Sequence, residues 1–328
     1  SAYSMRRNSA HADKFSVRIM NTVDHPFLQA RDGQAYLRKG LRRIWRTSAL
    51  QSFTPLRFLP PELMGYQGRA LVVDPDVFAV GDVYELLNRD LQGKALMCRP
   101  RSRKRGPAGP LASSVMLLDC ARLQHWRCAE QFDEMFEFKR DYQQWISLEL
   151  EDRETIGLFE DYWNDFDHLD ANTRLLHNTK RKTQPWKTGL PVDFTAAEKF
   201  RWYPPKGWLR RGRRLLFGTS TDPGQYKPHP DPNQERFFFG LLRECLEIAL
   251  QAPSGSNSQL QHLPLRRDIG AQPEFPLQVI AKILLGLRFA VHDVHRWVAG
   301  EITDPAAQII DIGMGGQTAH GVEVARTG

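Results

Sequence analysis

The sequence predicts an α/β fold followed by a helical C-terminal extension, and three observations support this. The apolar run at 70–73 predicts a buried strand, and a helix is expected soon after it. A second run, 111–119, predicts another strand. Further on, 236–250 has the apolar periodicity of an amphipathic helix, and 277–299 predicts a second helix. Strands and helices that alternate early in the chain favour a sheet flanked by helices.

The composition is that of a globular protein, with 41% hydrophobic and 25% charged residues among 328. This length allows one large domain, or one domain with an appendage. The longest apolar stretch, 279–291, is interrupted by Lys282 and Arg288, which favours an amphipathic helix over a membrane span there. Neither a signal-like N-terminus nor a metal-binding cysteine pattern is present, so we expect a cytoplasmic protein with reduced thiols.

The formal net charge is +7, and much of it lies in separate basic clusters. Such clusters bind phosphates, nucleic acid or anionic membranes, although solvated loops are the commoner explanation for any one of them. Known nucleic-acid modules interleave aromatic and basic residues, and this pattern is missing here. We therefore expect no nucleic-acid partner, and peripheral membrane contact stays open. The clusters are 38–46, 99–105, 180–187 and 210–214.

The strand at 70–73 ends in Asp74-Pro75-Asp76. Pro75 has no backbone N–H and favours an extended conformation at Asp74, so a central strand should end here. In an extended chain the side chains of Asp74 and Asp76 point to the same side, about 6 to 7 Å apart. Both carboxylates can then face one cation or a cation-bound diphosphate, although Asp-Pro-Asp is also ordinary turn chemistry. Asp82 is placed to cap a helix over 83–89.

Three motifs in order resemble those of the GT-A glycosyltransferases, especially the retaining family 8 group that includes glycogenin and bacterial lipopolysaccharide sugar transferases. The first is the Asp-x-Asp unit in 68–83, and the second is the small-residue strand Ala112-Ser113-Ser114-Val115. The third runs from His177 to Pro185-Trp186. It departs from the family pattern, because it is one residue longer, lacks the glycine and has Gln184 where the family has lysine. The resemblance implies a GT-A-like, Rossmann-like mixed sheet flanked by helices.

The resemblance also implies a site. Asp76 is the expected main metal ligand, Asp74 binds the metal or the ribose, and His177 is the third ligand. The cation would be Mn²⁺ or Mg²⁺, and a mixed carboxylate and imidazole site favours Mn²⁺. The residues expected to bind the sugar donor are Arg57, Ser113, Ser114, Lys182, Trp186 and Lys187. For each of them a structural or surface role is the alternative.

The implied activity is the metal-dependent transfer of a hexose from a nucleotide-diphosphate sugar, most plausibly a UDP-sugar, with retention of configuration. The acceptor is not identified, and no catalytic nucleophile can be assigned from the sequence. Two alternatives stay open: a catalytically inactive GT-A-like scaffold or fragment, and a nucleic-acid-binding protein that uses its arginine clusters.

Three regions are expected along the chain. Residues 1–195 form the GT-A-like catalytic domain, and we expect its first strand to be missing before Ser1. Residues 196–300 form a helical extension, which we assign to the acceptor side as a hypothesis. Residues 301–328 form a flexible tail, because they are glycine-rich and have no strong periodicity.

Overall fold

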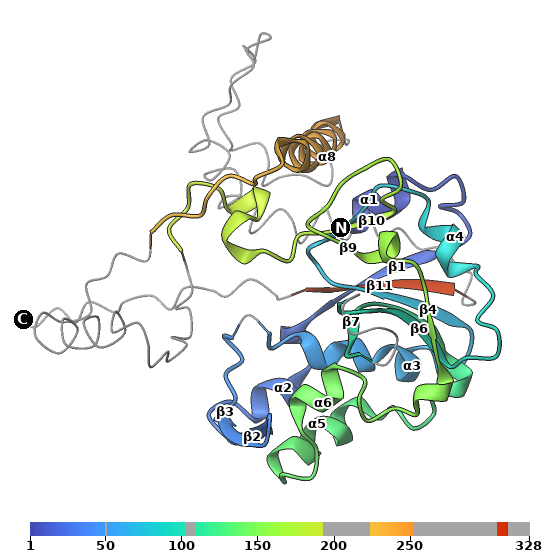
Figure 1. The fold of residues 1–328 in the computed structure, drawn as a ribbon, viewed down its shortest axis with the longest axis vertical. Helices are drawn as coiled ribbons and strands as arrows, with labels where there is room; N and C mark the ends of the chain where they lie inside the picture. Colours follow the sequence, from blue (N-terminus) through green and yellow to red (C-terminus); the bar gives the residue numbers. More distant parts are fainter. Residues whose placement is uncertain (50, 103–108, 193–223, 252–306, 314–328) are drawn as a thin grey trace, which may run out of the picture. The chain divides into compact units, whose positions relative to one another are not determined.

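The computed structural model describes residues 1–49, 51–102, 109–192, 224–251 and 307–313 (Figure 1). It has a mixed α/β architecture, as predicted. Two compact units are present, and each is described by itself. Residues 1–178 and 287–328 belong to the first unit, and residues 179–286 to the second.

A six-stranded mixed sheet forms the centre of the first unit, with the strand order β1-β11-β4-β7-β6-β8. The ladders from β1 to β11 and from β11 to β4 are parallel, β7 runs antiparallel to both β4 and β6, and β6 is parallel to β8. The strands are β1 (Ser16–Asn21), β4 (Arg69–Val73), β6 (Leu96–Pro100), β7 (Leu111–Asp119), β8 (Ile156–Leu158) and β11 (Ala307–Gly313).

Two small sheets accompany the large one. A three-stranded sheet has the order β5-β10-β9, and β2 and β3 form a separate hairpin. These strands are β2 (Ala35–Arg38), β3 (Leu41–Ile44), β5 (Val77–Ala79), β9 (Asp165–Phe166) and β10 (Leu175–His177).

Helices cover both sides of the large sheet: α3, α5 and α6 lie on one side, and α1 and α4 on the other (Figure 1). None of the helices in the described residues is both long and apolar enough to span a bilayer. The α-helices are α1 (Ala2–Arg7), α2 (Pro26–Ala30), α3 (Pro60–Leu63), α4 (Val83–Leu87), α5 (Cys128–Phe136), α6 (Tyr142–Ile146) and α8 (Pro232–Gln251). The 3₁₀ helices are η1 (Thr22–Asp24), η2 (Thr54–Phe58), η4 (Cys120–Arg122), η5 (Arg153–Thr155), η6 (Asp161–Asn164), η7 (Arg181–Thr183) and η8 (Pro185–Lys187).

The local helix predictions agree well with the structure. The helix expected at 83–89 is α4, and the Asp82 carboxylate caps it by accepting a hydrogen bond from the Tyr84 backbone N–H at 2.8 Å. The helix expected at 236–250 is α8, which begins at Pro232. The helix expected at 277–299 lies outside the described residues. Capping chemistry and periodicity are local signals, which explains why they succeed.

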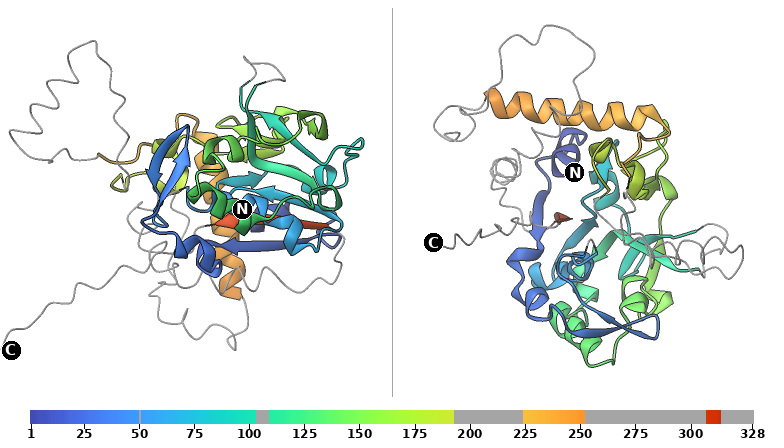
Figure 2. Two further views of the ribbon diagram at one scale, coloured as in Figure 1. Left: turned by 90° about the horizontal axis from the view of Figure 1, so that it is seen from below. Right: turned by 90° about the vertical axis from the view of Figure 1, so that its left-hand side faces the viewer.

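The expectation of a flexible tail over 301–328 is wrong for Ala307–Gly313, which forms β11 inside the large sheet (Figure 2). This strand pairs in parallel with β1 on one side and β4 on the other. Three β-branched isoleucines within seven residues favour a strand. The glycine-rich sequence that follows them led instead to the prediction of a tail. The ladder from β1 to β4 is therefore continuous, and its middle strand comes from the C-terminal region.

The register of β11 places its carboxyl end at the edge of the sheet where Asp74 lies. Asp311 stands opposite Val73, the last residue of β4, and opposite Ile19 of β1. Parallel strands end at the same edge, and ligands bind beyond that edge in open α/β sheets. The sheet thus directs the ends of β4 and β11 to a common edge.

Deleting residues 301–328 should destabilise the first unit strongly, because it unpairs the inner edges of both β1 and β4. We expect a thermal midpoint lower by about 10 °C or more, as a loss of several kcal/mol produces in a protein of this size. Calorimetry and amide hydrogen exchange of β1 and β4 measure the effect. Deleting only 314–328 keeps β11 and is the matched control, and equal stability of both deletions would contradict the assignment of β11.

Candidate metal centre

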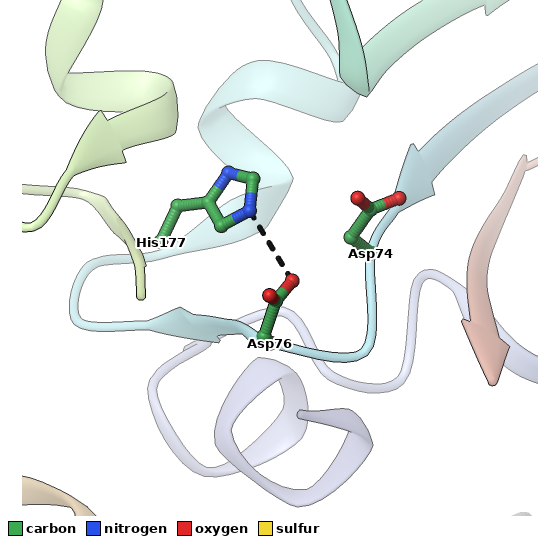
Figure 3. A group of neighbouring side chains, drawn as sticks. All are labelled: Asp74, Asp76 and His177. Carbon is green, nitrogen blue, oxygen red and sulfur yellow. Dashed lines mark ion pairs between the residues drawn. The ribbon is translucent and has the colours of Figure 1, made fainter. Parts of the chain in front are cut away.

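Asp74, Asp76 and His177 meet at the end of β4. One ligand atom of each lies within 4.8 Å of the others. The imidazole Nε2 of His177 is 3.2 Å from Asp76 Oδ1 (Figure 3). Asp74 follows the last residue of β4, and its carboxylate lies on the same side of the turn as the imidazole (Figure 3). The predicted convergence of His177 with the two aspartates, which lie about a hundred positions earlier in the sequence, is confirmed.

Strand pairing brings His177 to the aspartates. Beyond Asp76 the chain enters β5, which pairs antiparallel with β10 and sets Val77 opposite His177. The Asn178 backbone N–H donates to the Asp76 carbonyl at 3.1 Å and extends this pairing by one step. The Asp-Pro-Asp turn itself is closed by a hydrogen bond from the Val77 N–H to the Asp74 carbonyl at 3.0 Å. The ladder thus fixes the imidazole beside the turn.

Arg57 neutralises Asp74 with a two-pronged contact. Its Nε donates to Asp74 Oδ1 at 2.8 Å, and its Nη2 donates to Oδ2. Its Nη1 donates to the Ser113 hydroxyl at 2.8 Å. Arg57 comes from η2 and is buried, so its guanidinium is used for contacts within the protein. A planar guanidinium suits this bidentate contact far better than the point charge of a lysine.

Asp76 and His177 form the second charge pair of the centre. Burial lowers the pKa of His177, but the Asp76 carboxylate opposes it by charge and hydrogen bonding, and the net direction is upward. Burial raises the pKa of Asp76, but the charge and hydrogen bond of His177 outweigh it, and the net direction is downward. For Asp74, burial raises the pKa against the attraction of Arg57. Asp76 and His177 therefore each favour the charged form of the other.

The other imidazole nitrogen faces Asn164, a residue that the sequence analysis missed. His177 Nδ1 lies 2.8 Å from Asn164 Oδ1, and Asn164 Nδ2 donates to the Ser114 hydroxyl at 3.0 Å. Asn164 is fully buried at the end of η6, and Phe166 packs edge-on against the imidazole at a centroid distance of 5.3 Å. A single asparagine in an acidic and aromatic segment has no spacing signal that could have identified it.

Ser113 and Ser114 are buried in β7, where their hydroxyl groups bond to protein atoms. Ser113 Oγ accepts from Arg57 and donates to the Ile146 carbonyl at 2.6 Å. Ser114 accepts from Asn164 through its hydroxyl and from the Asp74 backbone N–H through its carbonyl, the latter at 3.0 Å. The two serines therefore connect both charge pairs to the sheet, and their contact with a sugar donor stays a prediction.

Lys182, Trp186 and Lys187 belong to the second unit, where they contact its own residues. Lys187 Nζ donates to the Tyr226 hydroxyl at 3.3 Å and lies 5.0 Å from the centre of that ring. The Trp186 ring lies 5.3 Å from that of Phe238, and the Lys182 carbonyl accepts from the Lys227 N–H. Their expected role in donor binding stays a prediction.

No family model matches this sequence, and no curated protein is similar to it. Weak similarity exists to solved structures at 16% sequence identity. The galactosyltransferase LgtC in complex with donor and acceptor sugar analogs has a TM-score of 0.32, with 40% of this chain and 60% of that one covered. Mouse xyloside xylosyltransferase 1 has a TM-score of 0.31, with 48% and 71% covered. The glycosyltransferase GlyE of Streptococcus pneumoniae TIGR4 has 0.36, with 78% and 62% covered. At these TM-scores the similarities do not assign a function to this chain.

Replacing Arg57 by methionine should destabilise the protein by about 3 to 5 kcal/mol, because it leaves the Asp74 carboxylate buried without its counter-charge. Combining it with Asp74→Asn should restore part of the loss, since no buried charge then remains. Urea unfolding of the two single variants and the double variant measures the coupling. Additive effects would mean that the contact between Arg57 and Asp74 does not stabilise the fold.

The Asp76–His177 pair should give the metal-free protein a characteristic pH dependence. His177 has a folded-state pKa above 6.5, so its contribution is present below pH 6.5 and is lost as the pH rises through the folded value. Asp76 has a folded-state pKa below 3.8, so its contribution is present above pH 3.8 and is lost in stronger acid.

The free energy of unfolding in EDTA should therefore fall above pH 6.5 by more in the wild type than in Asp76→Asn. Urea unfolding between pH 5.5 and 9 measures this difference. The exposed variant Asp13→Asn is the control and should keep the wild-type slope. Identical slopes in the wild type and Asp76→Asn would refute the pair's role.

Proposed function

We propose that the protein is a metal-dependent glycosyltransferase that moves a hexose from a nucleotide-diphosphate sugar, a UDP-sugar, to an acceptor with retention of configuration. The observation that carries this proposal is the meeting of Asp74, Asp76 and His177 at the carboxyl end of β4. Two carboxylates and an imidazole form a donor set for a divalent cation, and the order of motifs in the sequence supports nucleotide-sugar chemistry.

The residues present fit a divalent cation. Asp76 Oδ1 and His177 Nε2 lie 3.2 Å apart, a spacing at which both could serve as ligands of one ion. Asp74 offers a third ligand atom within 4.8 Å of those two, and its carboxylate forms an ion pair with Arg57. Mixed oxygen and nitrogen ligands suit Mn²⁺ better than Mg²⁺, which prefers oxygen. When bound, the cation would neutralise the leaving diphosphate and act as a Lewis acid.

The chain's own residues have defined tasks in this proposal. His177 releases its Nε2 proton so that the nitrogen lone pair becomes available. Arg57 keeps the Asp74 carboxylate fixed toward the metal or the ribose of the donor. In the transfer, the bond from the sugar's anomeric carbon to the diphosphate breaks, and a bond to an acceptor hydroxyl forms on the same face. The hydroxyl proton passes to the leaving phosphate, so no carboxylate nucleophile is required, and positioning and charge stabilisation supply the catalysis.

Arg57, Ser113, Ser114, Lys182, Trp186 and Lys187 are the proposed donor-binding residues. Lys187 lies over the aromatic ring of Tyr226. The positive charge would suit a diphosphate, and the ring would suit the face of a base or sugar. The acceptor is assigned to residues 196–300 as a hypothesis.

A specific observation favours a second candidate, the catalytically inactive scaffold. Each carboxylate of the centre already has a protein counter-charge: Asp74 has Arg57, and Asp76 has His177. A centre that is neutral without a cation can serve a structural purpose alone. The third candidate, a nucleic-acid-binding protein, rests on the sequence clusters, and it predicts binding that weakens steeply with salt.

Mn²⁺ should strengthen UDP binding to the wild type at least tenfold, because the cation bridges the protein ligands and the diphosphate. Asp76→Asn should abolish this enhancement, whereas the control Asp13→Asn should keep it, because Asp13 is exposed and belongs to neither group of potential metal ligands in the described residues. Calorimetric titration with UDP, with and without Mn²⁺, measures both. Equal affinity of the wild type in the two conditions would favour the scaffold, and a screen of nucleotide-sugar hydrolysis then separates a silent centre from an active one.

A further inference from the structure

Asn164 lies at the point where the two halves of the candidate metal centre are joined. It is fully buried, and its side-chain amide contacts His177 on one side and Ser114 on the other. Its own carbonyl accepts a hydrogen bond from Arg99 Nη1 at 2.7 Å, which fixes the backbone at the end of η6. Each polar group of the side chain is therefore satisfied, and the amide has a single orientation in the structure.

We propose that Asn164 is a positioning residue that keeps Nε2 of His177 as the nitrogen that binds the cation. The amide Oδ1 has only lone pairs, so it accepts a hydrogen bond from Nδ1–H at a distance of 2.8 Å between Oδ1 and Nδ1. Nδ1 thus keeps its hydrogen, and deprotonation for metal binding occurs at Nε2, which faces Asp76 at 3.2 Å. A hydrogen bond from the remote nitrogen orients the ring and raises its basicity as a ligand.

Ser114 sets the direction of the amide. Its hydroxyl accepts from Asn164 Nδ2 at 3.0 Å, so the NH₂ group points toward β7 and the Oδ1 atom toward His177. The same residue accepts the Asp74 backbone N–H through its carbonyl. A chain of contacts therefore runs from the Asp74 backbone through Ser114 and Asn164 to His177, so that one buried amide sets the orientation of the imidazole relative to the carboxylates.

This inference rests on the proposed function for the role of the cation, but its geometric part can be tested without metal or activity. In metal-free protein, at an acidic pH chosen so that both ring nitrogens carry hydrogen, nuclear magnetic resonance should detect an Nδ1–H of His177 that is protected from solvent exchange. Asn164→Leu should remove that protection and leave the Nε2–H signal in place. Asn164→Asp, which still offers an oxygen acceptor, should retain it.

Mn²⁺ affinity, measured by electron paramagnetic resonance, is the second readout. Asn164→Leu should weaken binding about 10- to 100-fold, as the loss of an outer hydrogen bond to a ligand histidine does in other metal sites. Asn164→Asp should bind at least as tightly as the wild type. The exposed Asn172→Ala is the matched control and should change neither readout. Ser114→Ala removes the hydroxyl that orients the amide, so it should weaken Mn²⁺ binding in the same direction as Asn164→Leu and by no more than that variant.

The outcomes separate the two claims. Unchanged Nδ1–H protection in Asn164→Leu, or loss of it in Asn164→Asp as well, overturns the positioning role. A wild type that binds no Mn²⁺ overturns the proposed function, while the resonance result still decides the role of Asn164. If the leucine variant does not fold, Asn164→Ala decides in its place, because it removes the same oxygen acceptor: unchanged Nδ1–H protection there overturns the inference, and loss of protection supports it.

Discussion

Two carboxylates at the end of a buried strand require counter-charges, and most of the centre follows from this constraint. A charge taken out of water is strongly unfavourable unless it is paired and hydrogen-bonded. Arg57, in η2 before the strand, forms an ion pair with Asp74. His177, in β10 much later in the chain, pairs with Asp76. Ser113 and Asn164 then satisfy the remaining polar atoms of those two cations. The electrostatic requirement thus connects four distant segments of the chain.

The sequence could predict what is local or repeated in a known pattern. The strand at 70–73, its end at Asp74 and the cap at Asp82 follow from propensity and turn chemistry, and the structure confirms each of them. The approach of His177 to the aspartates came from the order of motifs rather than from periodicity. The sequence could not predict which residues Arg57 and Asn164 contact. Arg57 contacts a carboxylate and Asn164 an imidazole. Neither contact has a signature in sequence spacing, because both form only when the sheet is assembled.

The position of β11 in the sheet could not be predicted from the sequence either, for a different reason. A strand of seven residues carries little periodic signal, and its parallel partners β1 and β4 lie nearly three hundred and more than two hundred positions earlier. Parallel pairing leaves no turn motif in the sequence, unlike a hairpin, so composition alone guided the expectation of a tail. Closing so long a connection costs only slightly more entropy than closing a shorter one, since the cost grows with the logarithm of loop length. Long-range insertion of a central strand is therefore acceptable for the fold but invisible to local reasoning.

When His177 is protonated, the charges of the centre cancel, and under the proposed function a cation would have to compete with a proton. An ion held by Asp76 and His177 would replace a proton on Nε2 and disrupt the existing ion pair, so its net affinity would be lower than the ligand set alone suggests. Arg57 limits the charge available from Asp74 in the same way. A diphosphate adds oxygen ligands and negative charge at once, and both changes favour the cation over the proton. Under the proposed function, metal and nucleotide would therefore bind cooperatively at this centre, because each compensates charge that the other brings. A purely structural ion pair would show no such coupling.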